Sequence, residues 1–258
     1  MKLGIMQGRL SEPVDGHIQE FPRDWKKEFV SLNSLGLNHV EWLVTKNSWL
    51  NNPIMENPKY VEKFPISFVC LDTLVDERIS EPDFLNENLG AACEKIYNTS
   101  ITNLTIPLLE DSSMADDTKR AKFCKLIKEF GDRFPMINFS FEAELQKEKL
   151  LEIVSLCDNF FVTYDTGNIT SYGINHSEYI DFFKHKINNV HLKDRTVNAT
   201  TVSPLTGDTN FDLIFNSLNK IGYNGVMTMQ TARSVTGKEI ETASKHKDIF
   251  MRLYERHF

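Results

Sequence analysis

Short apolar segments alternate with amphipathic helical segments along the whole chain. The pattern predicts strands at residues 3–6, 39–43, 66–71, 103–106, 136–141, 160–164, 189–192 and 225–229. It predicts helices near residues 22–35, 54–63, 82–98, 116–131, 145–156, 176–185, 209–222 and 237–254. Parallel neighbours need crossover connections, so this alternation predicts a parallel sheet covered by helices.

Eight strand–helix units in 258 residues match the repeat count and size of a (β/α)8 barrel. The segments Glu81-Pro82-Asp83, Asp116-Asp117 and 209–212 supply helix caps, while Gly36 and Gly222 follow helix ends. A doubly wound open sheet is the alternative, but the stretch after the first strand is not a glycine-rich phosphate loop. Since no low-complexity linker divides the chain, we expect one α/β domain, a TIM barrel over residues 1–258.

Composition and charge indicate which binding partners and which cellular compartment to expect. The chain is 41% hydrophobic and 25% charged, with a formal net charge of −7 and no basic stripe. An acidic surface repels phosphate backbones, so a nucleic-acid partner is disfavoured. The sequence shows neither a signal-peptide pattern nor an apolar run of membrane-spanning length, and its four cysteines are dispersed. We therefore expect reduced thiols, no membrane association and a cytoplasmic location.

The last four predicted strands carry or end on polar residues at equivalent depth. They are Glu142, Asp165, His191 and Gln230. The carboxyl ends of barrel strands form the active face, so these side chains should converge there. An oxygen-rich set with one imidazole suits Mn²⁺, Mg²⁺ or Co²⁺ better than a structural zinc site. The alternative for each residue taken alone is a helix cap or a hydrogen-bonded core side chain.

Several of these segments resemble one family. The pieces are Phe141-Glu-Ala-Glu-Leu145, Tyr164-Asp-Thr-Gly-Asn168, Val190-His-Leu-Lys-Asp-Arg195, Gly222-Tyr-Asn-Gly225 and the opening Gly4-Ile-Met-Gln-Gly-Arg-Leu-Ser11. The chain resembles the xylose isomerase-like TIM barrels, the sugar phosphate isomerase/epimerase superfamily. The resemblance spans nearly the full chain and is strongest from residue 136 onward.

The resemblance implies a divalent metal held by Glu, Asp, His and a second Glu from strands five to eight. Glu142, Asp165 and His191 would take the first three places, and Gln230 stands where the family has its second glutamate. A glutamine carbonyl can still bind a hard cation, but the amide cannot exchange protons near neutral pH. The substitution removes one negative charge, so metal affinity should fall.

The glutamine also bears on the reaction. Epimerases of the family use two glutamates on opposite faces of the substrate carbon, whereas aldose–ketose isomerisation needs one base. The sequence therefore favours isomerisation, or a related lyase chemistry, over epimerisation. The expected enzyme is a metal-dependent sugar or sugar-phosphate isomerase with Glu142 as base, an enediolate intermediate and Gln230 as a ligand. Lys193 or Glu41 could supply a second acid and restore epimerisation, as in a C3-type sugar epimerase.

Three arginines lie just past strand ends on the predicted active face. Arg9, Arg195 and Arg233 are candidate substrate-binding residues because guanidinium groups suit phosphate or carboxylate. The alternative is a salt bridge or a bond to a loop carbonyl. Glu41, in the second strand, is a further candidate substrate contact. Residues 8–22, which include Gln19, and residues 196–209 could wall the site.

Two other functions remain open at this point. The chain could be an altered barrel that binds a sugar-like ligand without turnover. An abasic-site endonuclease ranks last, because that family needs more strand-end histidines for three zinc ions and a basic surface. The expected partner is a small sugar or sugar phosphate, and the sequence leaves the oligomeric state open, a homo-oligomer included.

Overall fold

The computed structural model of the protein describes residues 1–197, 200–233 and 235–258. All eight predicted strands are present, and they form a closed barrel in the order β1-β10-β7-β6-β5-β4-β3-β2. Helices connect successive barrel strands. The predicted fold class, a (β/α)8 barrel, is therefore confirmed.

The barrel strands are short, and a small antiparallel pair follows the seventh. The barrel is built from β1 (Lys2–Met6), β2 (Val40–Leu43), β3 (Ile66–Cys70), β4 (Asn103–Leu108), β5 (Asn138–Ala143), β6 (Phe160–Asp165), β7 (Ile187–Leu192) and β10 (Val226–Met229). The antiparallel pair is β8 (Asp194–Arg195) with β9 (Thr201–Val202).

Contacts divide the chain into two compact units. Unit 1 comprises Met1–Glu41 and Tyr164–Phe258, and unit 2 comprises Trp42–Thr163. The organisation of the whole chain as one domain stays a prediction.

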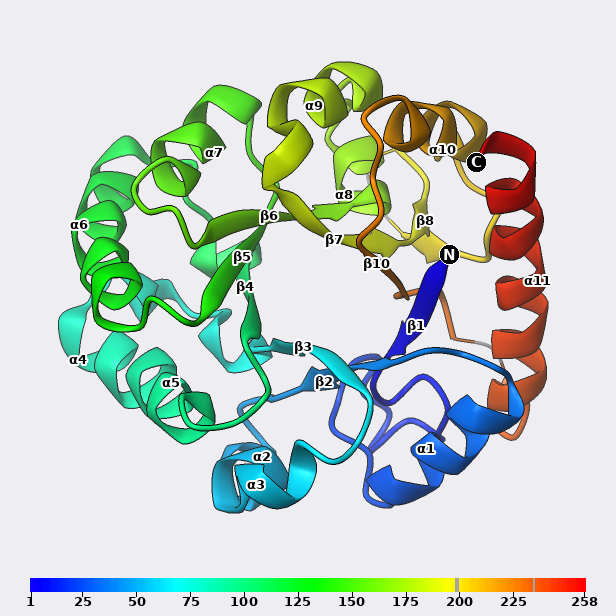
Figure 1. The fold of residues 1–258 in the computed structure, drawn as a ribbon, viewed down its shortest axis with the longest axis horizontal. Helices are drawn as coiled ribbons and strands as arrows, with labels where there is room; N and C mark the ends of the chain where they lie inside the picture. Colours follow the sequence, from blue (N-terminus) through cyan, green and yellow to red (C-terminus); the bar gives the residue numbers. More distant parts are fainter. Residues whose placement is uncertain (198–199, 234) are drawn as a thin grey trace. The chain divides into compact units, whose positions relative to one another are not determined.

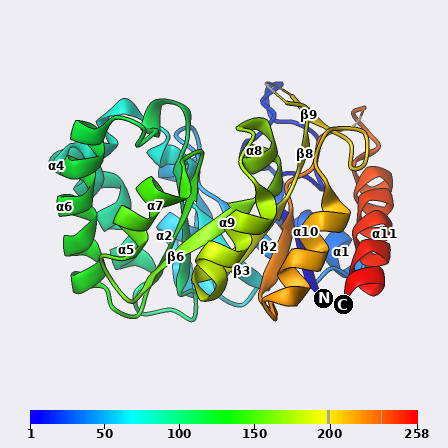
Figure 2. The ribbon, with the colours of Figure 1, turned by 90° about the horizontal axis from the view of Figure 1, so that it is seen from above.

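Unit 1 contains β1, β10 and β7 side by side, with α1, α10 and α11 outside them (Figure 1). The register pairs Gly4 with Thr228, and Thr228 with His191. Figure 2 shows β8 and β9 at the end of this unit opposite both chain termini. Its helical segments are α1 (Trp25–Ser34), α8 (Thr166–Ser171), α9 (His176–Phe183), η6 (Lys184–Lys186), α10 (Phe211–Lys220) and α11 (Glu239–His257).

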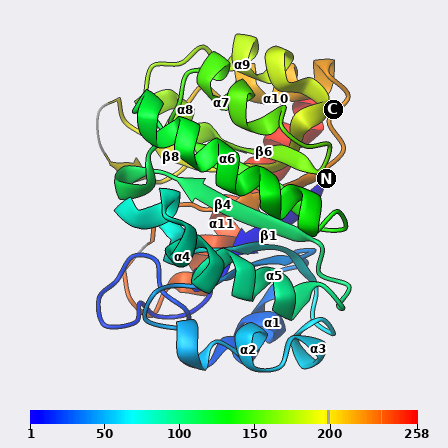
Figure 3. The same ribbon diagram turned by 90° about the vertical axis from the view of Figure 1, so that its left-hand side faces the viewer.

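Unit 2 places α4, α5 and α6 on the outer side of β4 (Figure 3). Phe139, Phe141 and Phe160 are fully buried and form edge-to-face ring contacts beside β5. Its helical segments are η1 (Trp49–Asn51), α2 (Pro53–Glu56), α3 (Pro58–Val61), η2 (Asp72–Leu74), η3 (Glu77–Ser80), α4 (Pro82–Leu85), η4 (Asn86–Gly90), α5 (Ala91–Ile96), η5 (Glu110–Ser112), α6 (Asp117–Arg133) and α7 (Lys147–Val154).

Most predicted helix ends are confirmed. The Asp116 side chain accepts from the backbone N–H of Lys119 at the start of α6. Gly36 and Gly222 follow α1 and α10 with φ of 65° and 69°, a backbone region that disfavours other residues. Glu81 makes no side-chain cap, and α4 begins instead with a proline at its first position.

Two helices predicted as continuous are divided. The segment 54–63 forms α2 and α3, because Asn57-Pro58 ends one helix and begins the next. The segment 82–98 has a widened turn, η4, between α4 and α5. Among the described residues, no helix is both long enough and apolar enough to cross a membrane. All four cysteines are free thiols, as expected.

Candidate functional site

Asp165 and His191 lie at the carboxyl ends of β6 and β7, in unit 1. Both side chains are buried, and His191 Nδ1 lies 3.9 Å from Asp165 Oδ2. That separation is too long for a hydrogen bond. It is short enough for both atoms to contact one cation at ligand distances of about 2.1 Å. The structure therefore brings together two residues that the sequence predicts as metal ligands.

Glu41 and Asn189 hold the other side of the His191 ring. His191 Nε2 lies 2.9 Å from Glu41 Oε2, and Asn189 Nδ2 donates to the same oxygen at 2.9 Å. All three side chains are fully buried. Asn189 was not among the residues predicted for the site. It precedes His191 by two positions in a strand, so both side chains point to one face. The substrate-binding role predicted for Glu41 stays a prediction.

Lys193 follows β7 and forms a buried ion pair. Its Nζ lies 2.8 Å from Asp165 Oδ2 and donates to Asn168 Oδ1 at 3.3 Å. Burial opposes ionisation of Asp165, but the positive charge of Lys193 and the hydrogen bond from the Asn168 backbone N–H lower its pKa below the ordinary value. Asp165 is therefore a carboxylate at neutral pH, the form that binds a cation.

A helix that the sequence did not predict, α8, begins directly at the end of β6. The Asp165 side chain accepts from the backbone N–H of Asn168 at 2.8 Å and so caps this helix with its other carboxylate oxygen. Gly167 leaves room for the side chains of Lys193 and Arg195, because a Cβ at this position would lie 2.9 Å from the Cγ atom of each. The segment Asp-Thr-Gly-Asn therefore positions both an acid and the cations beside it.

Gln230 directly follows β10 and is buried. Its backbone N–H donates to the carbonyl of Leu192, and its Nε2 donates to Gln19 Oε1 at 3.1 Å. Its Oε1 has no hydrogen-bond partner among the described residues. Leaving a buried acceptor unsatisfied costs about 1–3 kcal/mol. The amide carbonyl is therefore available to a ligand.

Glu142 belongs to unit 2, where it is the last but one residue of β5. It pairs in register with Pro107 of β4, and its side chain is buried. The sequence places it correctly at a strand end. Its metal-binding and catalytic roles stay predictions.

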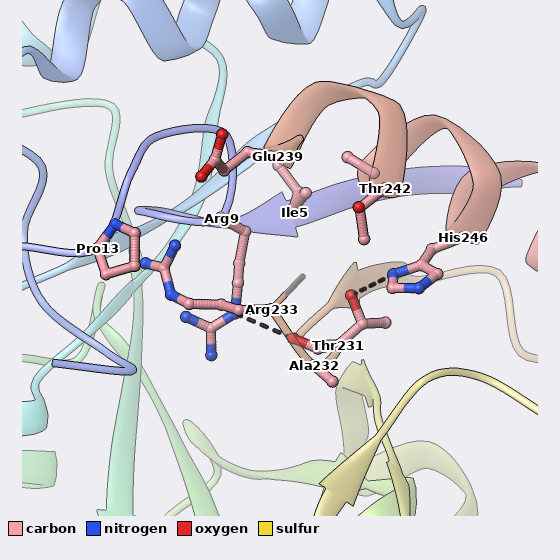
Figure 4. A pocket seen from close by; sticks show the side chains of 10 residues that line it. Ile5, Arg9, Pro13, Thr231, Ala232, Arg233, Glu239, Thr242 and His246 are labelled. Carbon is pink, nitrogen blue, oxygen red and sulfur yellow. Dashed lines mark hydrogen bonds between the residues drawn. The ribbon is translucent and has the colours of Figure 1, made fainter. Parts of the chain in front are cut away.

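Arg9 and Arg233 bind backbone carbonyls in unit 1. Arg233 donates to the carbonyls of Gly8, Ser11 and Ile18, and Arg9 donates to those of Ile18 and Thr231. Figure 4 shows the two guanidinium groups near each other, with Arg9 extending from the end of β1. These bonds are the loop-carbonyl alternative that the sequence leaves open for the arginines. The two residues tie the loop after β1 to the end of β10.

The cavity beside these arginines is small. It lies between β1, the segment after β10 and α11, and its volume is about 10 Å³. That is room for one water molecule at most. His246 Nδ1 and Thr231 Oγ1 form a 2.8 Å hydrogen bond at its wall. This cavity is therefore too small for a sugar.

Asp194 organises the loop between β7 and α10. Its carboxylate accepts from the backbone N–H groups of Thr206, Gly207 and Thr209. Arg195 donates to Asn168 Oδ1 at 3.0 Å. Residues 198 and 199 of the predicted wall lie outside the described residues. The anion-binding role predicted for Arg195 stays a prediction.

Comparison with known proteins places the chain in a family. The sequence model of the xylose isomerase-like TIM barrel family matches residues 116–251, more than half of the chain. The chain therefore belongs to this family. No curated protein matches its sequence.

Solved structures share the fold over nearly the full length. An IOLI protein with a bound zinc atom is 16% identical, with a TM-score of 0.77 and coverage of 100% of this chain and 99% of that chain. A D-allulose 3-epimerase from Methylomonas sp., solved in complex with D-allulose, is 14% identical (TM-score 0.74; 98% and 97% coverage). An L-ribulose 3-epimerase is 13% identical (TM-score 0.74; 99% and 95% coverage). At these identities the likeness establishes the fold alone.

Proposed function

We propose that the protein is a divalent-metal-dependent isomerase of a sugar or a sugar phosphate. The supporting observation is a buried Asp165 carboxylate 3.9 Å from His191 Nδ1, while the other ring nitrogen contacts Glu41. Family membership agrees with this chemistry, since the similar solved structures include sugar 3-epimerases. We propose a small sugar as the ligand.

The proposed metal ligands are Glu142, Asp165, His191 and Gln230. The first three are buried, and each offers one ligand atom. The buried Gln230 Oε1 lacks a partner in the described part of the chain, and a cation would satisfy it. Two carboxylates, an amide oxygen and one imidazole suit Mn²⁺, Mg²⁺ or Co²⁺. A related structure holds zinc, so zinc belongs in the test.

The chain's own residues would divide the chemistry as follows. When bound, the metal supplies Lewis-acid polarisation of the substrate carbonyl. Glu142 takes the proton from the carbon beside the carbonyl and returns it to the carbonyl carbon, while the hydroxyl proton passes to the former carbonyl oxygen, so the proton count is unchanged. Gln230 binds without exchanging protons, because an amide does not ionise near neutral pH. One base is enough for this aldose–ketose interconversion.

The test starts from protein stripped with EDTA and reloaded separately with Mn²⁺, Mg²⁺, Co²⁺ or Zn²⁺. Aldoses, ketoses and their phosphates are incubated with each form in D2O, and deuterium incorporation and products are followed by NMR. We expect metal-dependent isomerisation that Glu142→Gln abolishes. The control Glu144→Gln, the same change two residues later, should retain it. Equal loss in both variants would contradict the role of Glu142.

Gln230→Glu separates an enzyme from a binding protein. Replacing the amide by a third carboxylate should raise metal affinity by about tenfold or more, because ligand charge tunes the affinity of oxygen sites. Turnover should change in rate or in reaction type. No turnover and no solvent exchange in either the natural protein or this variant would replace the proposal with a sugar-binding barrel.

Epimerisation is the second candidate. Lys193 favours it, because its ammonium lies 2.8 Å from Asp165 Oδ2 and could deliver a proton that Gln230 cannot. Inversion at one carbon with the carbonyl position unchanged would identify this reaction. Lys193→Met should then abolish inversion, whereas a one-base isomerase would keep measurable proton transfer by Glu142.

A further inference from the structure

We propose that Glu41 is a positioning residue that fixes the ring of His191 so that Nδ1 is the metal-binding nitrogen. This proposal rests on the proposed metal site, but its central claim concerns the tautomer of His191 and can be measured without metal. It reassigns Glu41, which the sequence suggested as a substrate contact.

The contact is a buried one between distant parts of the chain. Glu41 Oε2 and His191 Nε2 are 2.9 Å apart, although the residues are 150 positions apart in sequence. The two side chains are fully buried, so solvent does not weaken the interaction. A carboxylate in such surroundings is costly unless several donors satisfy it. The contact therefore has to be a specific one.

Two donors converge on the same carboxylate oxygen. Asn189 Nδ2 donates to Glu41 Oε2 at 2.9 Å, which identifies this oxygen as an acceptor. His191 Nε2 lies 2.9 Å from this acceptor and 3.2 Å from Asn189 Nδ2, so we assign the proton on Nε2 to the shorter contact with Glu41. A neutral imidazole with its proton on Nε2 has its lone pair on Nδ1. The chain thereby selects one of the two tautomers.

The selected nitrogen is the one that faces the proposed metal ligands. His191 Nδ1 lies 3.9 Å from Asp165 Oδ2, on the opposite side of the ring from Glu41. Metal-binding histidines in proteins commonly donate their other N–H to a carboxylate, which orients the ring and makes it a stronger ligand. Mutation of such carboxylates typically lowers metal affinity by about 10- to 100-fold. Glu41 meets this description through its contacts with His191 and Asn189.

The first experiment reads the tautomer directly. Imidazole ¹⁵N and ¹³C shifts are recorded on the metal-free protein, and the His191 signals are assigned by their loss in His191→Gln. The natural protein should show the Nε2–H form, and Glu41→Ala should show a mixture or the Nδ1–H form. A merely structural role for Glu41 would not move these shifts. An Nδ1–H form in the natural protein would overturn the proposal.

The second experiment measures affinity with Mn²⁺ alone by calorimetry. Glu41→Ala should bind about 10- to 100-fold more weakly than the natural protein. Glu41→Gln keeps an oxygen acceptor of the same reach, so it should preserve the tautomer and recover part of the affinity. This conservative variant also keeps the test valid should Glu41→Ala not fold.

The matched control is Glu28→Gln. Glu28 is as buried as Glu41 and belongs to the same unit, but its carboxylate accepts from the backbone N–H groups of Gly8 and Leu10. This variant should leave the tautomer and the Mn²⁺ affinity unchanged. An equal loss of affinity there would assign the effect to general loosening and overturn the role of Glu41. A natural protein that binds no metal yet shows the Glu41-dependent Nε2–H form would refute the proposed function and leave the tautomer selection standing.

Discussion

Replacing Lys193 with methionine should destabilise the metal-free protein, and the size of the loss should depend on pH. The change removes the ammonium 2.8 Å from Asp165 Oδ2, where the lysine side chain is 12% exposed and the aspartate 2%. At an effective dielectric constant of 20, the direct attraction is about 6 kcal/mol. The variant can limit its loss by protonating Asp165. Each pH unit above the ordinary aspartate pKa of about 3.9 makes that protonation about 1.4 kcal/mol more costly.

Protonating Asp165 therefore costs about 4 kcal/mol at pH 7 and about 1.5 kcal/mol at pH 5, and these costs set the scale of the loss at each pH. In the natural protein the pKa of Asp165 lies below its unfolded value, so this group's stabilisation is present above about pH 3.9 and is lost as the pH falls through the folded value. Without Lys193, burial raises the pKa instead. The difference between the two proteins must then grow as pH rises.

Urea unfolding in EDTA, followed by circular dichroism at pH 5, 6 and 7, measures this difference. The matched control is Lys149→Met, which removes a lysine 2.9 Å from Asp117 in an ion pair whose side chains are 38% and 77% exposed. That variant should unfold at nearly the same urea concentration as the natural protein, because water screens the pair. A loss for Lys193→Met that is independent of pH, or no larger than in the control, would refute the reasoning.

Three further predictions concern the structure around the site. Burial lowers the pKa of His176 from 6.5 to about 4, so the stability of its neutral form is present above pH 6.5 and is lost as the pH falls toward 4. The slope of the unfolding free energy against pH reports the number of protons bound on unfolding, and His176→Gln should lower that number by about one in this pH range. An unchanged slope would contradict the lowered pKa of His176. Arg233→Met removes three bonds to the carbonyls of residues 8, 11 and 18, so amide exchange in that loop should accelerate by about tenfold or more. Unchanged exchange would show that other contacts hold the loop. Gly167→Ala places a methyl group 2.9 Å from the side chains of Lys193 and Arg195, and urea unfolding should show a loss of about 1–3 kcal/mol. A variant as stable as the natural protein would show that both side chains move aside freely.

The sequence pattern predicted some strand and helix boundaries inexactly, because tertiary contacts also decide where an element begins and ends. The sequence predicts the fifth strand at residues 136–141, whereas β5 spans Asn138–Ala143. Apolar Met136 suggested a strand residue, but it is 68% exposed and precedes the sheet. The six residues of α8 carry no helical run of apolar positions, and a cap from Asp165 at the end of β6 begins the helix. Such a helix depends on the strand before it and leaves little signal of its own.

The sequence by itself determined the fold class and the strand ends that carry Glu142, Asp165, His191 and Gln230. The alternation of strand-like and helix-like spacing of apolar residues is enough to predict the fold class and the strand ends. Each strand or helix must bury one face, and this requirement shows in its own residues.

Only the tertiary structure decided which side chains meet. Glu41 reaches His191 across 150 positions, and Gln19 reaches Gln230 across 211. Arg9 and Arg233 donate to backbone carbonyls of loop residues that are distant in sequence or belong to another loop, and their anion-binding role stays a prediction. Hydrogen bonds are short and directional, so the choice of partner depends on side-chain positions within a fraction of an ångström. Periodicity along the chain carries no information at that scale.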